Sequence, residues 1–380
     1  MIRILITSMI VILCCLDTAA GDLPIETVPR SQTLPKDYPD TWVFAYDFNF
    51  YSILDGKILI VDVAADNHNF KGIVGASGFA SFQYAGSRHE LYSAQSFYSR
   101  GTYGVRTDTV VITDPETLLP VGEVIIPTKR EQIVTQKNTF QLIDQERMGL
   151  VMNFTPAASV TVIDLVNRKV LGEIPIPGCN FIFPTGKRGF STLCNDGTLA
   201  SYTLSAAGAV TDSSRSKAFI DIDKDPLFVK NAVIGGITYF PSFHARVQPV
   251  DFRAETPKIL DDWQMVPAKL AAENWRPSGW QVAAGSDKQL FVLMQPNGKD
   301  ASHKDGGSEV WVFDPVRGRL ARRIKLRKHG ISIAVTHSKP AYLVVTNANM
   351  FLDVYRANSG DFQRSISVGD AATPLVVYTK

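Results

Sequence analysis

Two cysteines are the residues of this chain best suited to chemistry, because Cys179 and Cys194 are the only thiols after position 15. A thiol pair can bind a metal, exchange electrons or form a structural disulfide. The two are 15 positions apart (194 minus 179), which excludes a C-x-x-C redox motif. The segment between them has no His, Asp or Glu to complete a metal site. In an oxidising compartment we therefore expect a disulfide, which contributes about 3 kcal/mol when it closes a loop of this size.

The other polar motifs give no catalytic signature. None of the histidines stands at the separation of roughly two to four residues that is typical of a zinc pair. The segment Gly75–Phe79 lacks the final glycine of a nucleophile elbow, and Asn297–Ser302 has a Gly-Lys pair without the spacing of a phosphate loop. Asp221, Asp223 and Asp225 alternate as on a solvated strand face, with calcium binding as the alternative. A metal site assembled from distant segments stays open. The histidines are His68, His89, His244, His303, His329 and His337.

The N-terminus has the pattern of a secretory signal peptide. Arg3 supplies a positive charge, Ile4–Leu16 is apolar, and Thr18–Ala20 offers small residues for cleavage. The apolar run of about 13 residues is too short for a membrane span, which needs roughly 20. We expect residues 1–20 to be removed and the mature protein to be exported and soluble. The formal net charge of +2 argues against nucleic acid or an acidic membrane as the partner.

A repeated unit organises the rest of the chain. Each copy is a short β-run, an Asp or similar turn residue, a polar turn and a second β-run. Clear copies begin at Lys57, Thr107, Ala158 and Ser308, and weaker ones at Thr198, Ala245 and Met350. Their spacing of roughly 40 to 60 residues matches a propeller blade of four strands. Residues 21–380 are therefore predicted to form a single all-β domain, a seven-bladed β-propeller, in which the disulfide joins the two inner strands of one blade.

The two ends of the mature chain predict how the ring closes. One strand, Thr41–Phe48, precedes the first repeat, and one surplus strand, Pro374–Thr379, follows the last. Pairing them would complete one blade and leave no open sheet edge there. The β pattern is broken by Leu260–Trp280, where we expect a short helix around Pro267–Glu273, pinned by tryptophans, rather than a ligand cage. Gln295–Ser308 is predicted to be a surface loop.

The segment around the cysteines also resembles a known family. A cysteine, an aromatic and Pro-containing run, and a second cysteine followed by Asp-Gly are similar to the heavy (large) subunit of the quinoprotein amine dehydrogenases, which act on methylamine or aromatic amines. The segments Ser214–Val229 and Gln295–Lys304 are more similar to the aromatic amine enzyme. Further matching segments, in the same order along the chain, are Ser96–Pro120, Asn153–Leu165, Asn274–Gln281 and Ser302–Lys304.

The resemblance implies that the chemistry is divided between subunits. Members of this family are periplasmic propellers of seven blades that assemble as two heavy and two light chains. The light subunit carries tryptophan tryptophylquinone and the catalytic aspartate, so we expect no cofactor, metal or catalytic residue on this chain. The reaction converts a primary amine to an aldehyde and ammonia and passes electrons to a small copper protein of the azurin or amicyanin kind.

One residue role also follows from the resemblance. Phe79, within Gly75–Phe82, is implied to project into the substrate channel and to influence which amines fit; the alternative is an ordinary place in the core of a blade. Two other functions remain as alternatives for the whole chain. One is a free-standing secreted propeller that acts as a binding scaffold without a quinone partner. The other is a propeller hydrolase with a central metal.

Overall fold

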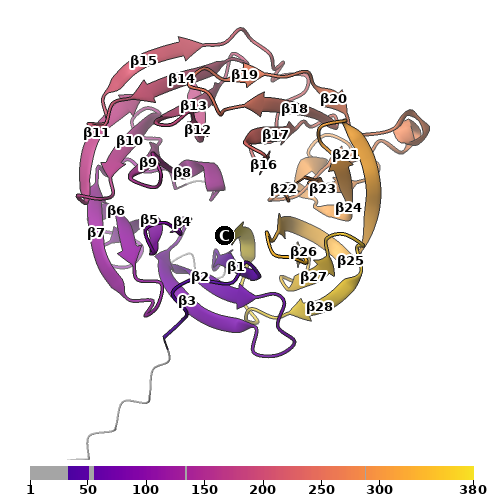
Figure 1. Cartoon of the computed structure of the whole chain (residues 1–380), viewed down its shortest axis with the longest axis horizontal. Coiled ribbons are helices and arrows are strands. Elements are labelled where there is room, and N and C mark those ends of the chain that lie inside the picture. Colours follow the sequence, from indigo (N-terminus) through magenta and orange to yellow (C-terminus); the bar gives the residue numbers. More distant parts are fainter. Residues whose placement is uncertain (1–32, 51–54, 133–134, 287) are drawn as a thin grey trace, which may run out of the picture. The chain divides into compact units, whose positions relative to one another are not determined.

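Antiparallel β-strands make up nearly all the regular structure of the chain. The structure is a computed structural model and describes residues 33–50, 55–132, 135–286 and 288–380. The predicted signal peptide, residues 1–20, lies outside the described residues. All the elements below belong to the unit Leu34–Lys380. In that unit the strands form sheets arranged around a common centre, where the C-terminus lies (Figure 1).

The first three sheets contain four strands each. The first has the order β29-β1-β2-β3, with β29 (Pro374–Thr379), β1 (Trp42–Asp47), β2 (Asp55–Asp62) and β3 (Phe70–Ser77). The second contains β4 (Ser81–Ala85), β5 (Glu90–Tyr98), β6 (Arg106–Thr113) and β7 (Pro120–Ile126). The third contains β8 (Phe140–Ile143), β9 (Met148–Asn153), β10 (Ser159–Asp164) and β11 (Lys169–Pro175).

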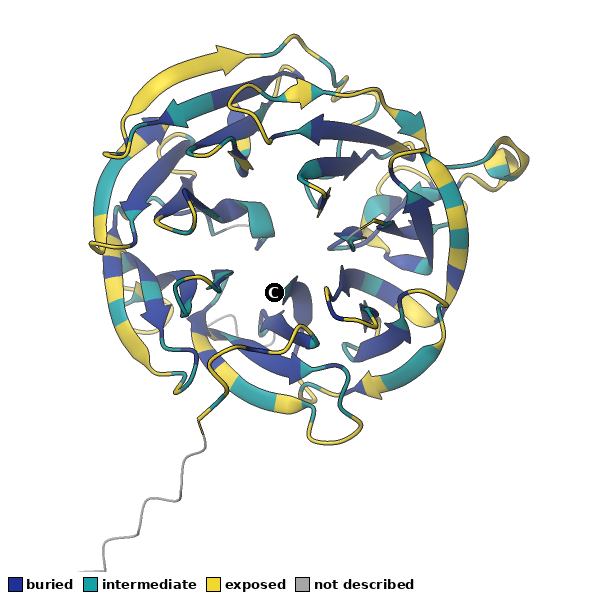
Figure 2. Cartoon of the chain, viewed as in Figure 1, coloured by how far each residue is buried: buried dark blue, intermediate teal, exposed yellow. Residues whose placement is uncertain are grey.

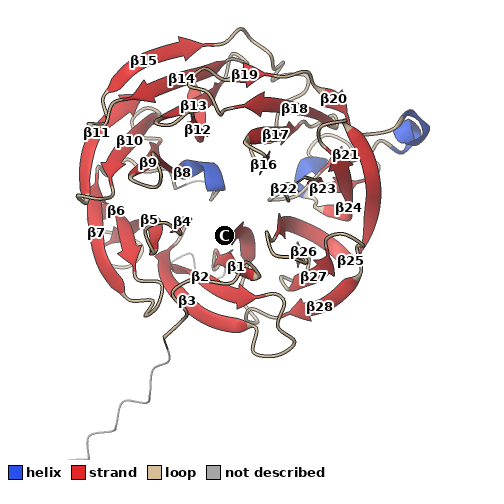
Figure 3. Ribbon diagram, viewed as in Figure 1, coloured by secondary structure: helices blue, strands red, loops and turns tan. Residues whose placement is uncertain are grey.

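The remaining sheets are more varied. The fourth contains β12 (Cys179–Thr185), β13 (Gly189–Cys194), β14 (Leu199–Leu204) and β15 (Val210–Arg215). The fifth contains β16 (Ala232–Ile234), β17 (Ile237–Pro241), β18 (Arg246–Asp251), β19 (Lys258–Ile259) and β20 (Trp263–Gln264). The sixth contains β21 (Arg276–Pro277), β22 (Ala283–Gly285), β23 (Leu290–Gln295), β24 (Gly307–Asp314), β25 (Arg319–Val335), β26 (Tyr342–Asn347), β27 (Leu352–Arg356) and β28 (Phe362–Ile366). Three short 3-10 helices accompany the described strands (Figure 3): η1 (Lys137–Thr139), η2 (Ala268–Glu273) and η3 (Ser302–Lys304).

The strand order confirms an all-β propeller but not the prediction of seven separate blades. In the described ranges, five sheets of four or five strands are separate blades, and the sixth sheet has eight strands. It is continuous because β25 is 17 residues long and pairs first with β24 and then with β26. Repeat counting assumes a turn between successive copies. Between Arg319 and Ile331, however, Gly330 is the only residue of a typical turn-forming type, so the strand runs on.

Burial decreases from the centre of the ring to its rim (Figure 2). All residues of β1 are buried, whereas all residues of β15 are exposed. The inner strands lie between the faces of neighbouring sheets and therefore read as continuous apolar runs, as strands buried on both faces do. One core cluster, for example, includes Tyr92 and Val110 of the second sheet together with Phe140 and Val151 of the third. Apolar packing between sheets thus holds the ring together.

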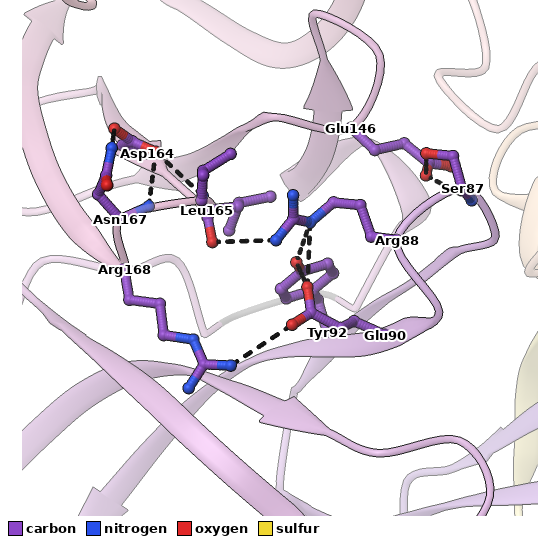
Figure 4. Close-up of polar contacts among 10 residues, drawn as sticks. Ser87, Arg88, Glu90, Tyr92, Glu146, Asp164, Leu165, Asn167 and Arg168 are labelled. Atoms are coloured by element: carbon purple, nitrogen blue, oxygen red, sulfur yellow. Dashed lines mark hydrogen bonds and ion pairs between the residues drawn. The ribbon is translucent and has the colours of Figure 1, made fainter.

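The recurring aspartate of the sequence repeat is a turn-forming residue. Asp114, Asp164 and Asp314 each follow or end the third strand of a blade, and each Oδ1 accepts backbone N–H groups two and three residues later. Figure 4 shows this arrangement at Asp164 and Asn167. Hydrogen bonds from Thr117 lower the pKa of Asp114, which therefore stays ionised at neutral pH.

Polar contacts connect the second and third sheets near the same turns (Figure 4). The Arg88 Nη2 donates to the carbonyl oxygen of Leu165 at 3.4 Å, and Arg168 Nη2 lies 3.5 Å from a carboxylate oxygen of Glu90. The Arg168 side chain is 41% exposed, and exposed ion pairs contribute at most about 1 kcal/mol. These contacts set the orientation of the turns, while the apolar clusters supply most of the stability.

The predicted closure and the predicted disulfide are both confirmed. β29 pairs antiparallel with β1, with Val43 opposite Thr379 and Phe44 opposite Tyr378. The disulfide joins Cys179 of β12 to Cys194 of β13, the first two strands of the fourth sheet, and both cysteines are buried. The closure pairs the strands at the two ends of the repeat array, and the disulfide joins two adjacent strands of one sheet, as the sequence predicted.

The segment Leu260–Trp280 is largely as predicted. Its helix is η2, a 3-10 helix with no buried residue. The Trp263 ring packs on Phe313 at 5.3 Å and the Trp275 ring on Trp311 at 5.1 Å, so aromatic packing does fix the insertion. Gln295–Ser308 forms a connection that contains η3. No helix among the described residues is long and apolar enough to cross a membrane.

Candidate functional site

Connections from different sheets gather at one end of the ring. In each antiparallel blade the chain enters the innermost strand at this end and returns to it after the second strand. The segment before β4, which holds Phe79, therefore lies at the same end as Phe48 and Phe50, which follow β1. Trp280, which precedes β22, joins them there. We call these four residues the aromatic cluster.

Phe79 contacts the aromatic cluster and also packs against the buried apolar core between the first and second sheets. Its ring meets Phe48 edge-on, with centroids 5.5 Å apart, and its side chain is only half-buried. Phe48 also stacks on Phe50 at 5.2 Å and meets Trp280 edge-on at 5.6 Å. The Phe50 side chain is 46% exposed, so the cluster reaches the surface. Such stacked and edge-on pairs are favourable beyond their buried area, by roughly 0.5–1.5 kcal/mol.

Hydrogen bonds hold the backbone around Phe79 in an unusual conformation. Phe79 has φ +55°, a left-handed conformation that is rare for an aromatic residue. The hydroxyl of Tyr46 donates to Ser77 O at 2.9 Å and accepts the N–H of Ala80 at 2.8 Å, so it clamps both sides of the turn. Burial raises the pKa of Tyr46 to about 12, and the hydroxyl stays protonated as a donor. The turn therefore fixes the direction of the Phe79 side chain.

A buried charged network, formed by Ser96, Arg106, Asp108 and Arg130, supports the same turn. Arg130 Nη1 donates to the carbonyl oxygen of Phe79 at 2.8 Å, and its Nε donates to Ser96 Oγ at 3.0 Å. Arg106 binds both carboxylate oxygens of Asp108, at 2.7 and 2.8 Å. Asp108 also accepts Ser96 Oγ and the backbone N–H of Arg130. Asp108 is fully buried, and burial lowers the pKa of Arg130, although a guanidinium remains charged.

A cavity of about 290 Å³ lies among the innermost strands. Residues of β4, β22, β25 and β29 contribute to its wall, together with η1 and the connection before β16. Trp280 belongs both to this wall and to the aromatic cluster. Two lysines, Lys137 and Lys230, also line the cavity. The cavity therefore adjoins the end of the ring where Phe79 lies.

Exposed aromatic side chains concentrate at this same end. Of the five phenylalanine and tyrosine side chains that are exposed among the described residues, four follow or end the second strand of a blade. They are Phe50, Phe97, Tyr103 and Phe154, and the fifth, Phe70, begins β3 at the opposite end. Exposed aromatic groups gathered on one face are typical of an interaction surface. We call Phe50, Phe97, Tyr103 and Phe154 the aromatic face.

The acidic segment Asp221–Asp225 differs from its prediction. It forms a turn rather than a strand face. The carboxylate of Asp221 accepts the backbone N–H of Lys224 and pairs with its ammonium group at 2.8 Å, while Asp225 accepts Ser242 Oγ and the backbone N–H of His244. Side-chain bonding to nearby backbone favours a turn over an extended run. Across the described ranges no group of three or more His, Cys, Asp or Glu could hold a metal ion.

The strand order and the ring of sheets define the chain as a β-propeller protein. It is similar in fold to the β-propeller domain of Cps50 (Swd1) from Myceliophteria thermophila, with a TM-score of 0.53 and 12% identity over 84% of this chain and 96% of that one. It is also similar to dihydro-heme d1 dehydrogenase NirN, with a TM-score of 0.52 and 11% identity over 92% of this chain and 77% of that one. At such identities the likeness shows the fold alone.

The family model described as methylamine dehydrogenase heavy chain matches residues 43–379, and the chain belongs to this family. The methylamine dehydrogenase heavy chain of Methylophilus methylotrophus is 26% identical over 315 residues, which cover 81% of this chain and 77% of the relative. That of Methylorubrum extorquens is 25% identical over 351 residues, covering 89% and 82%. These findings confirm the resemblance to an amine dehydrogenase heavy subunit. The preference for the aromatic amine enzyme stays a prediction.

Proposed function

We propose that this chain is the periplasmic heavy subunit of an amine dehydrogenase that binds a light subunit bearing tryptophan tryptophylquinone. The family match along nearly all of the described chain carries the proposal. The assembly would contain two heavy and two light chains and would pass electrons to a small copper protein. When bound in the light subunit, the quinone supplies the oxidation of the amine. This chain would hold the light subunit and shape the path of the amine.

The aromatic face supports a docking role. Phe97 and Tyr103 are 45% and 63% exposed, and both belong to the second sheet, next to the turn of Phe79. Phe50 and Phe154 extend the face to the first and third sheets. Burial of aromatic groups is a large source of binding energy in protein interfaces. A light subunit bound here would cover the aromatic cluster and place its reactive centre against Phe79.

The aromatic cluster supports a role in amine selection. A protonated amine is attracted to the face of an aromatic ring, and its hydrocarbon part is stabilised by apolar contact. Phe79 offers both kinds of contact, and its position is fixed by the turn and by Arg130. Removal of water by the docked light subunit would strengthen the attraction of the ammonium group to the ring and the apolar contact of the hydrocarbon part. We therefore assign the substrate as an aromatic or longer primary amine.

Co-purification with a light subunit tests the proposal directly. Co-expression of this chain with its cognate small, Cys-rich light chain should yield a stable complex that oxidises primary amines with an artificial electron acceptor. The chain alone should not oxidise amines, because the quinone belongs to the partner. Amine oxidation by the purified chain alone would contradict the proposal. Failure to recover any complex would favour the free-standing scaffold instead.

Changing Phe79→Ala tests the role in selection. In the assembled complex we expect the ratio of kcat/KM for an aromatic amine to that for methylamine to change by about tenfold or more, as loss of a hydrophobic pocket contact does. Phe70→Ala is the matched control, since Phe70 is also exposed but begins β3 at the other end of the ring. An unchanged ratio in Phe79→Ala, with a normal melting temperature, would show that Phe79 only packs.

A further inference from the structure

The wall of the central cavity is positively charged. Its ionisable residues are two lysines, Lys137 in η1 and Lys230 in the connection before β16, together with His337 and Tyr378. Among the described residues no Asp or Glu lines the cavity. Two ammonium groups line one cavity of about 290 Å³, and no carboxylate among the described residues of its wall compensates their positive charge.

Neither lysine forms an ion pair with a residue that the structure describes. Lys137 Nζ lies 5.3 Å from the centre of the Tyr378 ring. Lys230 Nζ lies 5.1 Å from the Trp280 ring and 3.5 Å from the carbonyl oxygen of Gly279. By contrast, the ammonium group of the half-exposed Lys129 lies 2.8 Å from a carboxylate oxygen of Glu173. Both lysine side chains are only partly exposed. A partly desolvated ammonium group without a counter-ion among the described residues is stabilised by an anion of suitable size.

We propose that the central cavity binds a small oxyanion of the carboxylate or phosphate class at its two lysines, Lys137 and Lys230. Ammonium groups attract both kinds of oxyanion strongly, and the cavity volume lies near the lower end of small-molecule sites. The same charges repel a protonated amine, so this is a separate site from the aromatic cluster. Trp280 contacts Lys230 in the cavity wall and Phe48 in the aromatic cluster. An anion bound at Lys230 would therefore lie beside the aromatic cluster.

The charge of the site depends on pH. Burial lowers the pKa of Lys137 and of Lys230 to about 8, so both ammonium groups are present at pH 7 and are largely lost by pH 9.5. Tyr378 faces Lys137, and burial raises its pKa, so it remains neutral over this range. His303 lies near Lys230. Burial lowers the pKa of His303, and the positive charges of Lys304 and Lys230 lower it further. His337, the other ionisable residue of the wall, also belongs to this site. We expect oxyanion affinity to fall between pH 7 and pH 9.5.

Calorimetric titration of the full chain with inorganic phosphate, with citrate and with chloride tests the inference. We expect phosphate, citrate or both to bind at pH 7 at least tenfold more tightly than chloride, and at least tenfold more weakly at pH 9.5. Binding of only one of the two would identify its chemical class. Lys137→Met and Lys230→Met should each weaken that binding at least tenfold. Lys269→Met, at an exposed position in η2, should leave it unchanged.

Thermal unfolding provides a second readout and a check on folding. The bound oxyanion should raise the melting temperature of the wild-type chain and of Lys269→Met, but not that of Lys137→Met or Lys230→Met. Both methionine variants should fold, since each removes a desolvated charge and keeps an apolar stem of similar length. Binding no tighter than that of chloride, or affinity retained in both cavity variants, would overturn the inference. Neither result would bear on the light-subunit proposal, which co-purification tests separately.

Discussion

Deleting Pro374–Lys380 is expected to lower the melting temperature by more than 10 °C or to prevent folding. The strand β29 buries Leu375, Val376, Val377 and Tyr378 between the first and neighbouring sheets. Each such side chain contributes roughly 1.5–3 kcal/mol on burial, and a whole domain is stable by only about 5–15 kcal/mol. The deletion also leaves one edge of β1 without its partner. Thermal unfolding followed by circular dichroism measures the effect.

A matched control separates the strand from the tail. Removing Lys380 alone deletes the hydrogen bond from its Nζ to the carbonyl oxygen of Tyr38 and its exposed ion pair with Asp40 at 3.5 Å, and leaves β29 intact. We expect that variant to melt within a few degrees of the wild type. A synthetic peptide with the sequence of Pro374–Lys380 should partly restore the truncated chain by adding the missing strand. A truncated chain with the melting temperature of the wild type would refute closure by β29.

The sequence allowed this closure to be predicted because its signals are local. An unpaired strand at each end of a set of repeats can be counted without knowing the fold, and the same holds for two cysteines in adjacent strands. The number of separate blades could not be predicted in this way. Whether β25 bends or breaks after Lys325 depends on its pairing with β24 and β26, two strands that lie on opposite sides of it in the sheet. Propensity alone does not fix that choice.

The candidate site was predictable only in part. The resemblance pointed to Phe79, but the residues that hold it come from elsewhere in the ring. Arg106 and Asp108 alternate along β6, so the pattern places them on one face. Arg130 reaches them from the connection between the second and third sheets, and no local pattern marks it. The cavity lysines are similar, because the closed ring alone brings their segments to one wall.

The buried network makes the second large prediction possible. Asp108→Asn should lower the free energy of unfolding by about 3–5 kcal/mol, the usual cost of leaving buried charges without their partner. The amide has nearly the shape of the carboxylate, so the loss would come from charge. The partly exposed Arg106 would lose its bidentate partner, and the buried Arg130 would keep its charge without the carboxylate beside it. Urea unfolding measures the change.

Asp196→Asn is the control for the second prediction, because Asp196 also pairs with an arginine, Arg215 at 3.0 Å, but on the surface. Its effect on unfolding should be much smaller, since solvent screens exposed pairs. In the assembled complex Asp108→Asn should also alter the ratio of activities on aromatic amine and methylamine, because Arg130 would hold the Phe79 turn less firmly. Asp196→Asn should leave that ratio unchanged. Equal effects of the two substitutions on both measurements would mean that the network does not position Phe79, and that the turn is held by Tyr46 alone.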